Sequence, residues 1–228
     1  MMIGHTIAFA AVLISGVLSA NADGAAQHVW RGDVTSRLEV LAALQSLQID
    51  LLTHDSATLT LDDWCARRHI SAPGSKIVAE RDEAVVKPAS AEQRRLLDVS
   101  ADEPIRYRRV RLKCGTHVLS EADNWYVPSR LTPQMNAELD RSNTAFGRVV
   151  QALRFRRQTL SAKLLWSPLP SGWDSGTATV IGAATLQIPL HVIENRALLV
   201  TANGAPFSEV VESYTSEVLD FAAPSHSD

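Results

Sequence analysis

The chain has 228 residues, of which 46% are apolar and 21% charged, and its formal net charge at pH 7 is −3. A chain of this length and composition can bury a sizeable core, and one domain behind a processed N-terminus is the expected partition. The small negative charge excludes a general electrostatic attraction to nucleic acid or to anionic membranes, so we expect neither as a partner.

Residues 1–22 have the pattern of a signal peptide. The apolar run over 7–18 is too short for a stable membrane anchor, and Ala20 and Ala22 after it have the A-x-A spacing of a signal peptidase site. No Lys or Arg precedes the run, so an uncleaved anchor and an ill-chosen start site are the alternatives. The pattern predicts a periplasmic or secreted protein with no membrane span after processing.

The rest of the chain is predicted to divide into a loose arm over 23–35, one folded domain over 36–221 and a disordered tail over 222–228. Ser36 with Glu39 three residues later has the spacing of a capping box, which predicts the start of a helix. Leucines follow at intervals of three or four residues as far as Leu51. This stripe indicates a helix with one buried face, and a partner-binding face is the alternative.

Further elements follow from local signals. In chain order, we expect a helix from Thr60 to Arg68, one or two strands over 76–86, a small helix capped by Ser90, helices over 132–139 and 145–155, and a strand over 160–166. The segment 178–186 stays open between helix and strand, because its periodicity does not decide.

Two stretches, 105–128 and 190–215, each begin after a proline, run as an extended strand, turn at a glycine and return. Their returning strands, LSEADNWYV and FSEVVESYT, align without a gap at an offset of 88 residues, which suggests a duplicated hairpin. Together the elements predict an α+β fold, in which a largely antiparallel β-sheet has helices packed on one face. We expect these two hairpins to form the sheet that carries any ligand site.

Cys65 and Cys114 are the two cysteines of the chain. In an oxidising compartment they could pair, and closing the loop between them would stabilise the fold by about 4 kcal/mol in the chain-entropy model. Two separate buried thiols are the alternative. The wide spacing, without clustered histidines, argues against a zinc site.

The first strand of the first hairpin carries several cations. Alternation places Tyr107, Arg109, Arg111 and Lys113 on one face, and Val110, Leu112 and Cys114 on the other. A solvated outer face is the simple interpretation. The alternative is that one arginine points into a pocket and holds a carboxylate in a bidentate way.

The last strand places Glu212 between Val210 and Tyr214 on one face, where both neighbours are typical of a core. A buried carboxylate must be paired, hydrogen-bonded or protonated, because burying it alone is costly. We therefore predict that Arg109 and Glu212 face each other across a small cavity. A buried salt bridge with no ligand is the alternative.

Several motifs together resemble the chorismate lyase family. They are the segment RVRLKCG that begins at Arg109, the pair Val127-Pro128, the segment NTAFGR over 143–148, and GAP at 204–206 with ESY at 212–214. The resemblance covers about 45–221. The paired pattern of proline, strand, glycine turn and strand also resembles the effector-binding UTRA domain of bacterial transcription regulators.

The resemblance implies an antiparallel sheet whose helices enclose a ligand cavity. It also implies elimination of pyruvate from chorismate to give 4-hydroxybenzoate, a step of ubiquinone biosynthesis, without metal or cofactor. The implied catalytic residues are Arg109, which binds a carboxylate, and Glu212, with Glu209 as the alternative carboxylate. The implied substrate-binding residues are Arg109, Arg111, Phe146, Gly147 and Ala57, where Ala57 replaces a larger pocket-covering methionine.

Export fits this enzyme poorly, because chorismate is a cytosolic metabolite. The second hypothesis is a non-catalytic extracytoplasmic protein that binds a small aromatic carboxylate in the same pocket. The third is a structural or interaction protein with no pocket. In all three cases we expect a monomer.

Overall fold

The structure is a computed structural model that describes residues 28–223. The predicted signal peptide, residues 23–27 of the arm and residues 224–228 of the tail lie outside the described residues. The helices are α1 (Val34–Thr53), α2 (Ala57–Arg68), α3 (Ala91–Leu96), α4 (Pro133–Arg141) and α5 (Phe146–Val149). The strands are β1 (Ile77–Arg81), β2 (Arg106–Cys114), β3 (His117–Tyr126), β4 (Arg156–Leu164), β5 (His191–Val200) and β6 (Pro206–Thr215). Short 3₁₀ helices cover Pro128–Arg130, Gln151–Leu153 and Ser216–Leu219.

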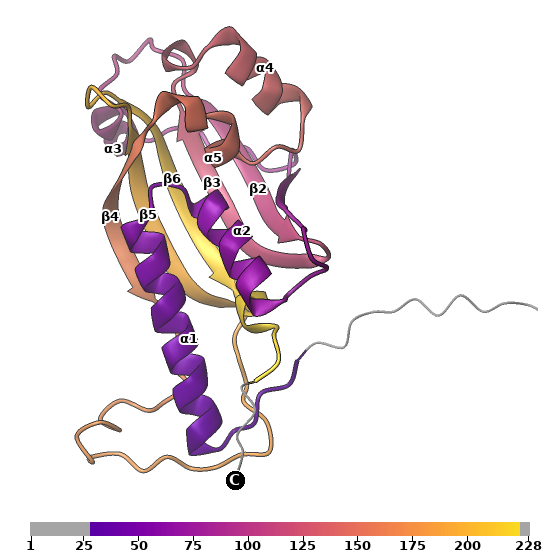
Figure 1. Cartoon of the computed structure of the whole chain (residues 1–228). Helices are drawn as coiled ribbons and strands as arrows, with labels where there is room; N and C mark the ends of the chain where they lie inside the picture. The colour runs from indigo at the N-terminus through magenta and orange to yellow at the C-terminus, as the bar shows by residue number, and fades with distance from the viewer. Residues whose placement is uncertain (1–27, 224–228) are drawn as a thin grey trace, which may run out of the picture.

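The strands form one six-stranded sheet in the order β1-β2-β3-β6-β5-β4, and every neighbouring pair is antiparallel (Figure 1). The two predicted hairpins are β2–β3 and β5–β6, and they meet along β3 and β6. The predicted α+β fold with a largely antiparallel sheet is therefore confirmed.

The register of the central strand pair agrees with the duplication. Residues that correspond at the offset of 88 exchange places across the pair: Ser120 lies opposite Tyr214, and Tyr126 lies opposite Ser208. The corresponding residues Asp123 and Val211 lie opposite each other. A local two-fold axis through this last pair relates the two hairpins, so corresponding residues lie on the same face of the sheet.

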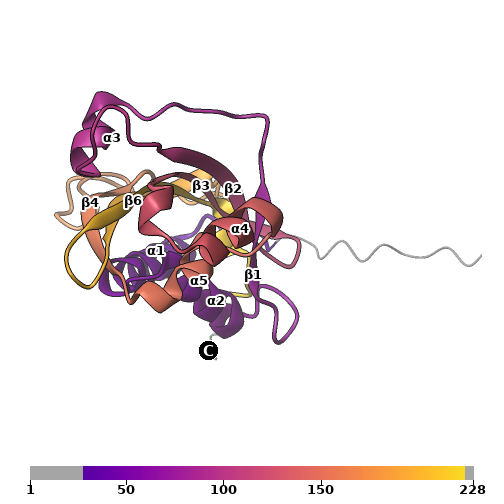
Figure 2. The same ribbon diagram turned by 90° about the horizontal axis from the view of Figure 1, so that it is seen from above.

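The two faces of the sheet are covered differently. Helices α1, α2 and α5 lie on one face, which we call the inner face, whereas α3 lies on the opposite, outer face (Figure 2). The predicted leucine stripe is confirmed as core from Leu41 to Leu51, whereas Leu38, at its start, is 40% exposed. On the outer face, Leu97 after α3 packs with Leu198. Most of the helical cover, and the largest core cluster, thus belong to the inner face.

Two helices start earlier than the capping patterns predict. Asp33, not Ser36, is the N-cap of α1, and its side chain accepts a hydrogen bond from the Ser36 backbone N–H at 2.9 Å. Ser56, not Thr60, caps α2. In both cases the side chain of the earlier residue accepts a hydrogen bond from a backbone N–H of the first turn, of Ser36 in α1 and of Leu59 in α2, which removes the need for the predicted cap.

The predicted loose arm is wrong for its described part. Trp30 is only 2% exposed, and its indole N–H donates to the Leu219 carbonyl at 2.9 Å. Gly32 forms a β-bridge with Ala183. The segment 178–186 is accordingly neither helix nor strand. It is a loop that the arm holds against the domain through backbone hydrogen bonds at Ala183 and Leu186.

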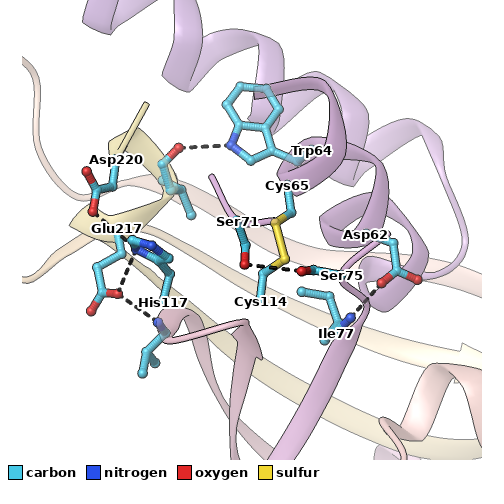
Figure 3. Close-up of a disulfide and its surroundings, with 12 residues drawn as sticks. Asp62, Trp64, Cys65, Ser71, Ser75, Ile77, Cys114, His117, Glu217 and Asp220 are labelled. Atoms are coloured by element: carbon cyan, nitrogen blue, oxygen red, sulfur yellow. Dashed lines mark hydrogen bonds and ion pairs between the residues drawn. A yellow bond between two sulfur atoms is a disulfide. The ribbon is translucent and has the colours of Figure 1, made fainter. Parts of the chain in front are cut away.

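Cys65 on α2 and Cys114 at the end of β2 form a disulfide (Figure 3). Both residues are buried, and the bond fixes α2 on the inner face of the sheet. Next to it, the Trp64 indole donates to the Val218 carbonyl at 2.9 Å. On the other side, His117 Nδ1 lies 3.1 Å from an Asp220 oxygen. These contacts tie α2, the β2–β3 turn and the C-terminal segment together.

Candidate functional site

A small, partly open cavity lies between the inner face of the sheet and the helices α2 and α5. Its volume is about 40 Å³. Much of its wall is apolar, with Val110, Leu112 and Val210 from the sheet and Phe146 and Phe155 from the covering segments. The polar wall residues include Ser56, Thr58, Arg108, Asn124, Arg157 and Glu212.

Arg108 on β2 is a buried charged residue of the cavity wall that lacks an ion pair among the described residues. It is 7% exposed, and among the described residues it forms one hydrogen bond, from Nη2 to the Thr144 carbonyl at 3.3 Å, and no ion pair. Its buried Nε and Nη1 have no hydrogen-bond partner there. Burial, with the nearby positive charge of Arg81, lowers the pKa of Arg108 to about 10. A buried guanidinium without a carboxylate is costly, so this site favours an anion.

Asn124 on β3 extends the set of donors. It lies directly opposite Arg108 in the register of β2 and β3, and it is 4% exposed. Its Oδ1 accepts a hydrogen bond from Ser208 at 2.6 Å, which leaves Nδ2 buried and unpaired among the described residues. Three nitrogen atoms of two adjacent side chains therefore have protons to donate and no acceptor. Such a set suits the two oxygens of a carboxylate.

Glu212 on β6 lies in the same cavity but is already paired. Its carboxylate forms an ion pair with Arg157 on β4, and the two side chains are 7% and 4% exposed. The Tyr214 hydroxyl donates to the same carboxylate at 3.1 Å. Burial lowers the pKa of Arg157, but the attraction of Glu212 outweighs this and the net direction is upward. Burial and then Glu212 raise the pKa of Tyr214 well above its usual value.

Four of the predicted site residues lie on the wall of this cavity: Ala57, Phe146, Gly147 and Glu212. At Gly147 there is no space for a larger residue, because an added Cβ would lie 2.7 Å from the Ser56 hydroxyl and 2.9 Å from that of Thr58. Glycine therefore lets α5 approach the start of α2 and close this end of the cavity.

The prediction that Arg109 faces Glu212 is wrong. Arg109 points to the outer face, where it pairs with Asp123 at 3.0 Å and Glu121 at 3.2 Å. Arg111 is on the same outer face, is exposed and pairs with Glu80. The reason is strand alternation, since Arg108, not Arg109, is in phase with the buried Val110.

Glu209, the alternative carboxylate, also lies outside the cavity. It is completely buried on the outer face and forms an ion pair with Arg196 at 2.6 Å. Among the two carboxylates considered, only Glu212 reaches the cavity.

Sequence reasoning missed Arg108, Asn124 and Arg157. For Arg108 a signal existed, because an arginine two residues before Val110 in a strand must share its buried face. The same argument identified Glu212 between Val210 and Tyr214. For Arg157 no such signal existed, because β4 has no clear alternation: seven of its nine residues are exposed and the other two are half-buried.

Comparison with known proteins gives one strong relative. The chain is 52% identical over 203 residues to the uncharacterized protein y4mC of Sinorhizobium fredii, a match that covers 89% of this chain and 86% of the relative. No model of a known protein family matches the chain.

Solved structures give weaker similarities. The chain is similar to the possible transcriptional regulator YydK of Bacillus subtilis, with 16% identity and a TM-score of 0.39, over 67% of this chain and 63% of that one, less than two thirds of its length. It is also similar to the effector domain of PhnF from Mycobacterium smegmatis, with 12% identity and a TM-score of 0.45, over 76% and 96% of the two chains. At these scores the similarities carry no argument about the site. Separately, none of the helices in residues 28–223 has the length and hydropathy needed to cross a membrane.

Proposed function

We propose that this chain, which belongs to the same family as the protein y4mC of Sinorhizobium fredii, is an extracytoplasmic binding protein for a small carboxylate. The ligand's carboxylate binds Arg108 and Asn124 inside the cavity. The observation that carries the proposal is a buried guanidinium with two unpaired nitrogens and no ion pair among the described residues.

The energetics favour a ligand over a purely structural role for Arg108. Each buried donor without an acceptor costs about 1–3 kcal/mol, and more when the group is charged. A structural arginine at this position would gain by pairing, as Arg157 does with Glu212 at the other side of the cavity. A bound carboxylate would supply the missing acceptor oxygens for Arg108 and for Asn124 Nδ2.

The cellular location is part of the proposal. A disulfide between Cys65 and Cys114 persists in an oxidising compartment, and cytosolic proteins of most organisms keep such thiols reduced. This agrees with the signal-like residues 1–22. An extracytoplasmic monomer that retains a small ligand is the form in which we expect the protein to act.

Chorismate lyase activity is the second candidate. It is favoured by the presence of Glu212 in the same cavity as the carboxylate-binding Arg108, with Phe146 and Gly147 on the wall. Against turnover stands the ion pair of Glu212 with Arg157, together with the hydrogen bond from Tyr214. A carboxylate held by two partners is poorly placed to donate or accept a proton during elimination.

One experiment separates the two candidates. The purified chain is titrated with benzoate and with 4-hydroxybenzoate by calorimetry, and in parallel it is incubated with chorismate while 4-hydroxybenzoate is followed by absorbance. Binding proteins bind without turnover, and an Arg108→Ala variant is expected to lose at least about tenfold in affinity, as loss of a charged hydrogen bond implies. Arg109→Ala, on the outer face, is the matched control and is expected to bind as the original chain does.

Each outcome has a distinct meaning. Turnover of chorismate that disappears in Arg108→Ala and Glu212→Gln establishes the lyase in place of the binding protein. Equal binding by Arg108→Ala and Arg109→Ala removes Arg108 from the site and overturns the proposal. If neither benzoate nor 4-hydroxybenzoate binds, the cavity has only a structural role and the proposal is overturned.

A further inference from the structure

The cavity around Arg108 is too small for a whole organic ligand. Its volume of about 40 Å³ compares with about 300–1,000 Å³ for typical ligand pockets. A space of this size accommodates a carboxylate group or a few water molecules. Any larger ligand with its carboxylate on Arg108 must therefore extend out of the cavity.

A second space adjoins the cavity. It is a groove of about 610 Å³ between the end of α1, the start of α2 and the segment 151–155. Three residues, Asp55, Ser56 and Phe155, line both the cavity and the groove. The two spaces thus adjoin at these three residues, and the groove is the natural continuation of the cavity.

Phe155 is the apolar part of that wall. It is 7% exposed and packs edge-on against Phe207, with ring centroids 6.0 Å apart. The residue before it, Arg154, has a backbone φ of 47°, in the left-handed region that non-glycine residues seldom adopt. The backbone N–H of Arg157, two residues after Phe155, donates to Asp55 Oδ1 at 2.9 Å. This hydrogen bond, the backbone hydrogen bonds from Leu153 to Val150 and from Arg154 to Gln151, and the pairing of β4 with β5 hold the segment next to the cavity.

The groove itself suits an apolar group. Of its eleven lining residues only Leu59 and Phe155 are apolar, but most of the surface that the lining exposes to the groove comes from apolar atoms. Its most prominent charge, Arg67, is already shared between Asp50 and Asp63 at 2.6 Å each. A polar ligand would have to compete with these pairs, whereas an apolar chain can be buried without breaking them.

We infer that the ligand is an amphiphilic monocarboxylate, whose carboxylate occupies the cavity at Arg108 and whose apolar body passes Phe155 into the groove. This rests on the proposed carboxylate binding at Arg108 and names the class of ligand. Phe155 moves aside when the body enters, and it separates the two spaces when only a short acid is bound.

The test is a chain-length series. The purified chain is titrated by calorimetry with formate, butyrate, hexanoate and octanoate. From butyrate to octanoate, burial of the added carbons predicts an increase in affinity of about fourfold per methylene. Leu59 lines the groove and not the cavity, so Leu59→Asp is expected to abolish the gain with length and to leave formate binding unchanged. Leu52→Asp, at an exposed leucine of α1 outside the groove, is the matched control.

The outcomes distinguish this inference from the proposed function. Binding of formate through Arg108 with no gain for the longer acids overturns the inference and leaves the carboxylate site in place. A gain in affinity with acid length that persists in Leu59→Asp means that the apolar body of the ligand lies outside the groove, and this also overturns the inference. Tighter binding of octanedioate than of octanoate shows that the groove prefers a second charge, which overturns an apolar body. No binding of any acid by the original chain refutes the proposed function itself.

Discussion

Arg108 and Arg109 are neighbours in the sequence but belong to opposite faces of the sheet. Arg109, on the outer face, has three carboxylates within reach, of Asp82, Glu121 and Asp123. Arg108, on the inner face, is more deeply buried and forms no ion pair among the described residues. The more exposed arginine is therefore the one whose charge is compensated, although burial makes compensation more necessary.

This difference separates an arginine that maintains the fold from one that is available to a ligand. On the outer face, the ion pairs of Arg109 and Arg111 are partly exposed to water, where each pair contributes little, and the buried Glu209 is paired with Arg196. In the cavity on the inner face, Arg157 is paired with Glu212, whereas Arg108 has no ion pair among the residues that the structure describes. The lack of an ion-pair partner, and not burial alone, therefore identifies the ligand-binding side chain.

The largest effect on stability is expected from breaking the buried ion pair between Arg157 and Glu212 on the inner face. Glu212→Ala leaves the buried guanidinium of Arg157 without a partner, and we expect a loss of about 3–5 kcal/mol in the free energy of unfolding. Glu80→Ala removes the exposed outer pair with Arg111, and we expect a loss below about 1 kcal/mol. Urea denaturation of both variants measures the difference. Similar losses at the two sites would contradict the distinction between the faces.

The disulfide supports the inner face, because Cys114 lies on the same side of β2 as Arg108. Replacing both cysteines by serine is expected to cost about 2–4 kcal/mol of unfolding free energy, mainly through greater freedom of the unfolded chain. Denaturation with and without reductant checks this. A count of free thiols on the unreduced protein provides the control, and two free thiols would exclude the bond.

Arg108→Met tests whether the unpaired guanidinium of Arg108 lowers the free energy of unfolding. Because it removes unpaired buried donors, we expect the free energy of unfolding to rise by about 1 kcal/mol while carboxylate binding is lost. Arg109→Met should have the reverse effect, with lower stability and unchanged binding. Thermal denaturation together with calorimetric titration measures both properties. A destabilised Arg108→Met variant would indicate that Arg108 is compensated after all.

The smallest effect concerns the outer network at low pH. Burial of Asp123 raises the pKa of its carboxyl, but Lys87, Tyr107 and Arg109 outweigh this and the net direction is downward. A lowered pKa means that ionised Asp123 stabilises the fold above its usual pKa of about 4, and that this contribution disappears as the pH falls further. Asp123→Asn should therefore show a weaker decline in stability between neutral and acidic pH. Urea denaturation across that range measures it, and an unchanged decline would remove Asp123 from the network.

The sequence alone determined much of the fold. Two hairpins with a matching returning strand predict the central sheet, and the leucine stripe predicts the helix that covers it. These features depend on local periodicity, which is set by the geometry of strands and helices. The burial of Glu212 followed from the same alternation, because Val210 and Tyr214 share its face.

The tertiary structure decided which charges meet. The alternation of β2 puts Arg108 in the same set as the apolar Val110, Leu112 and Cys114, and this set faces the helices, so choosing Arg109 as the inward residue was wrong. The partner of Glu212 is Arg157, which comes from a strand 55 residues away and has no signal in its own sequence. Ion pairs of this kind depend on the register between distant strands and on the packing of helices over them, and neither is encoded in a local pattern.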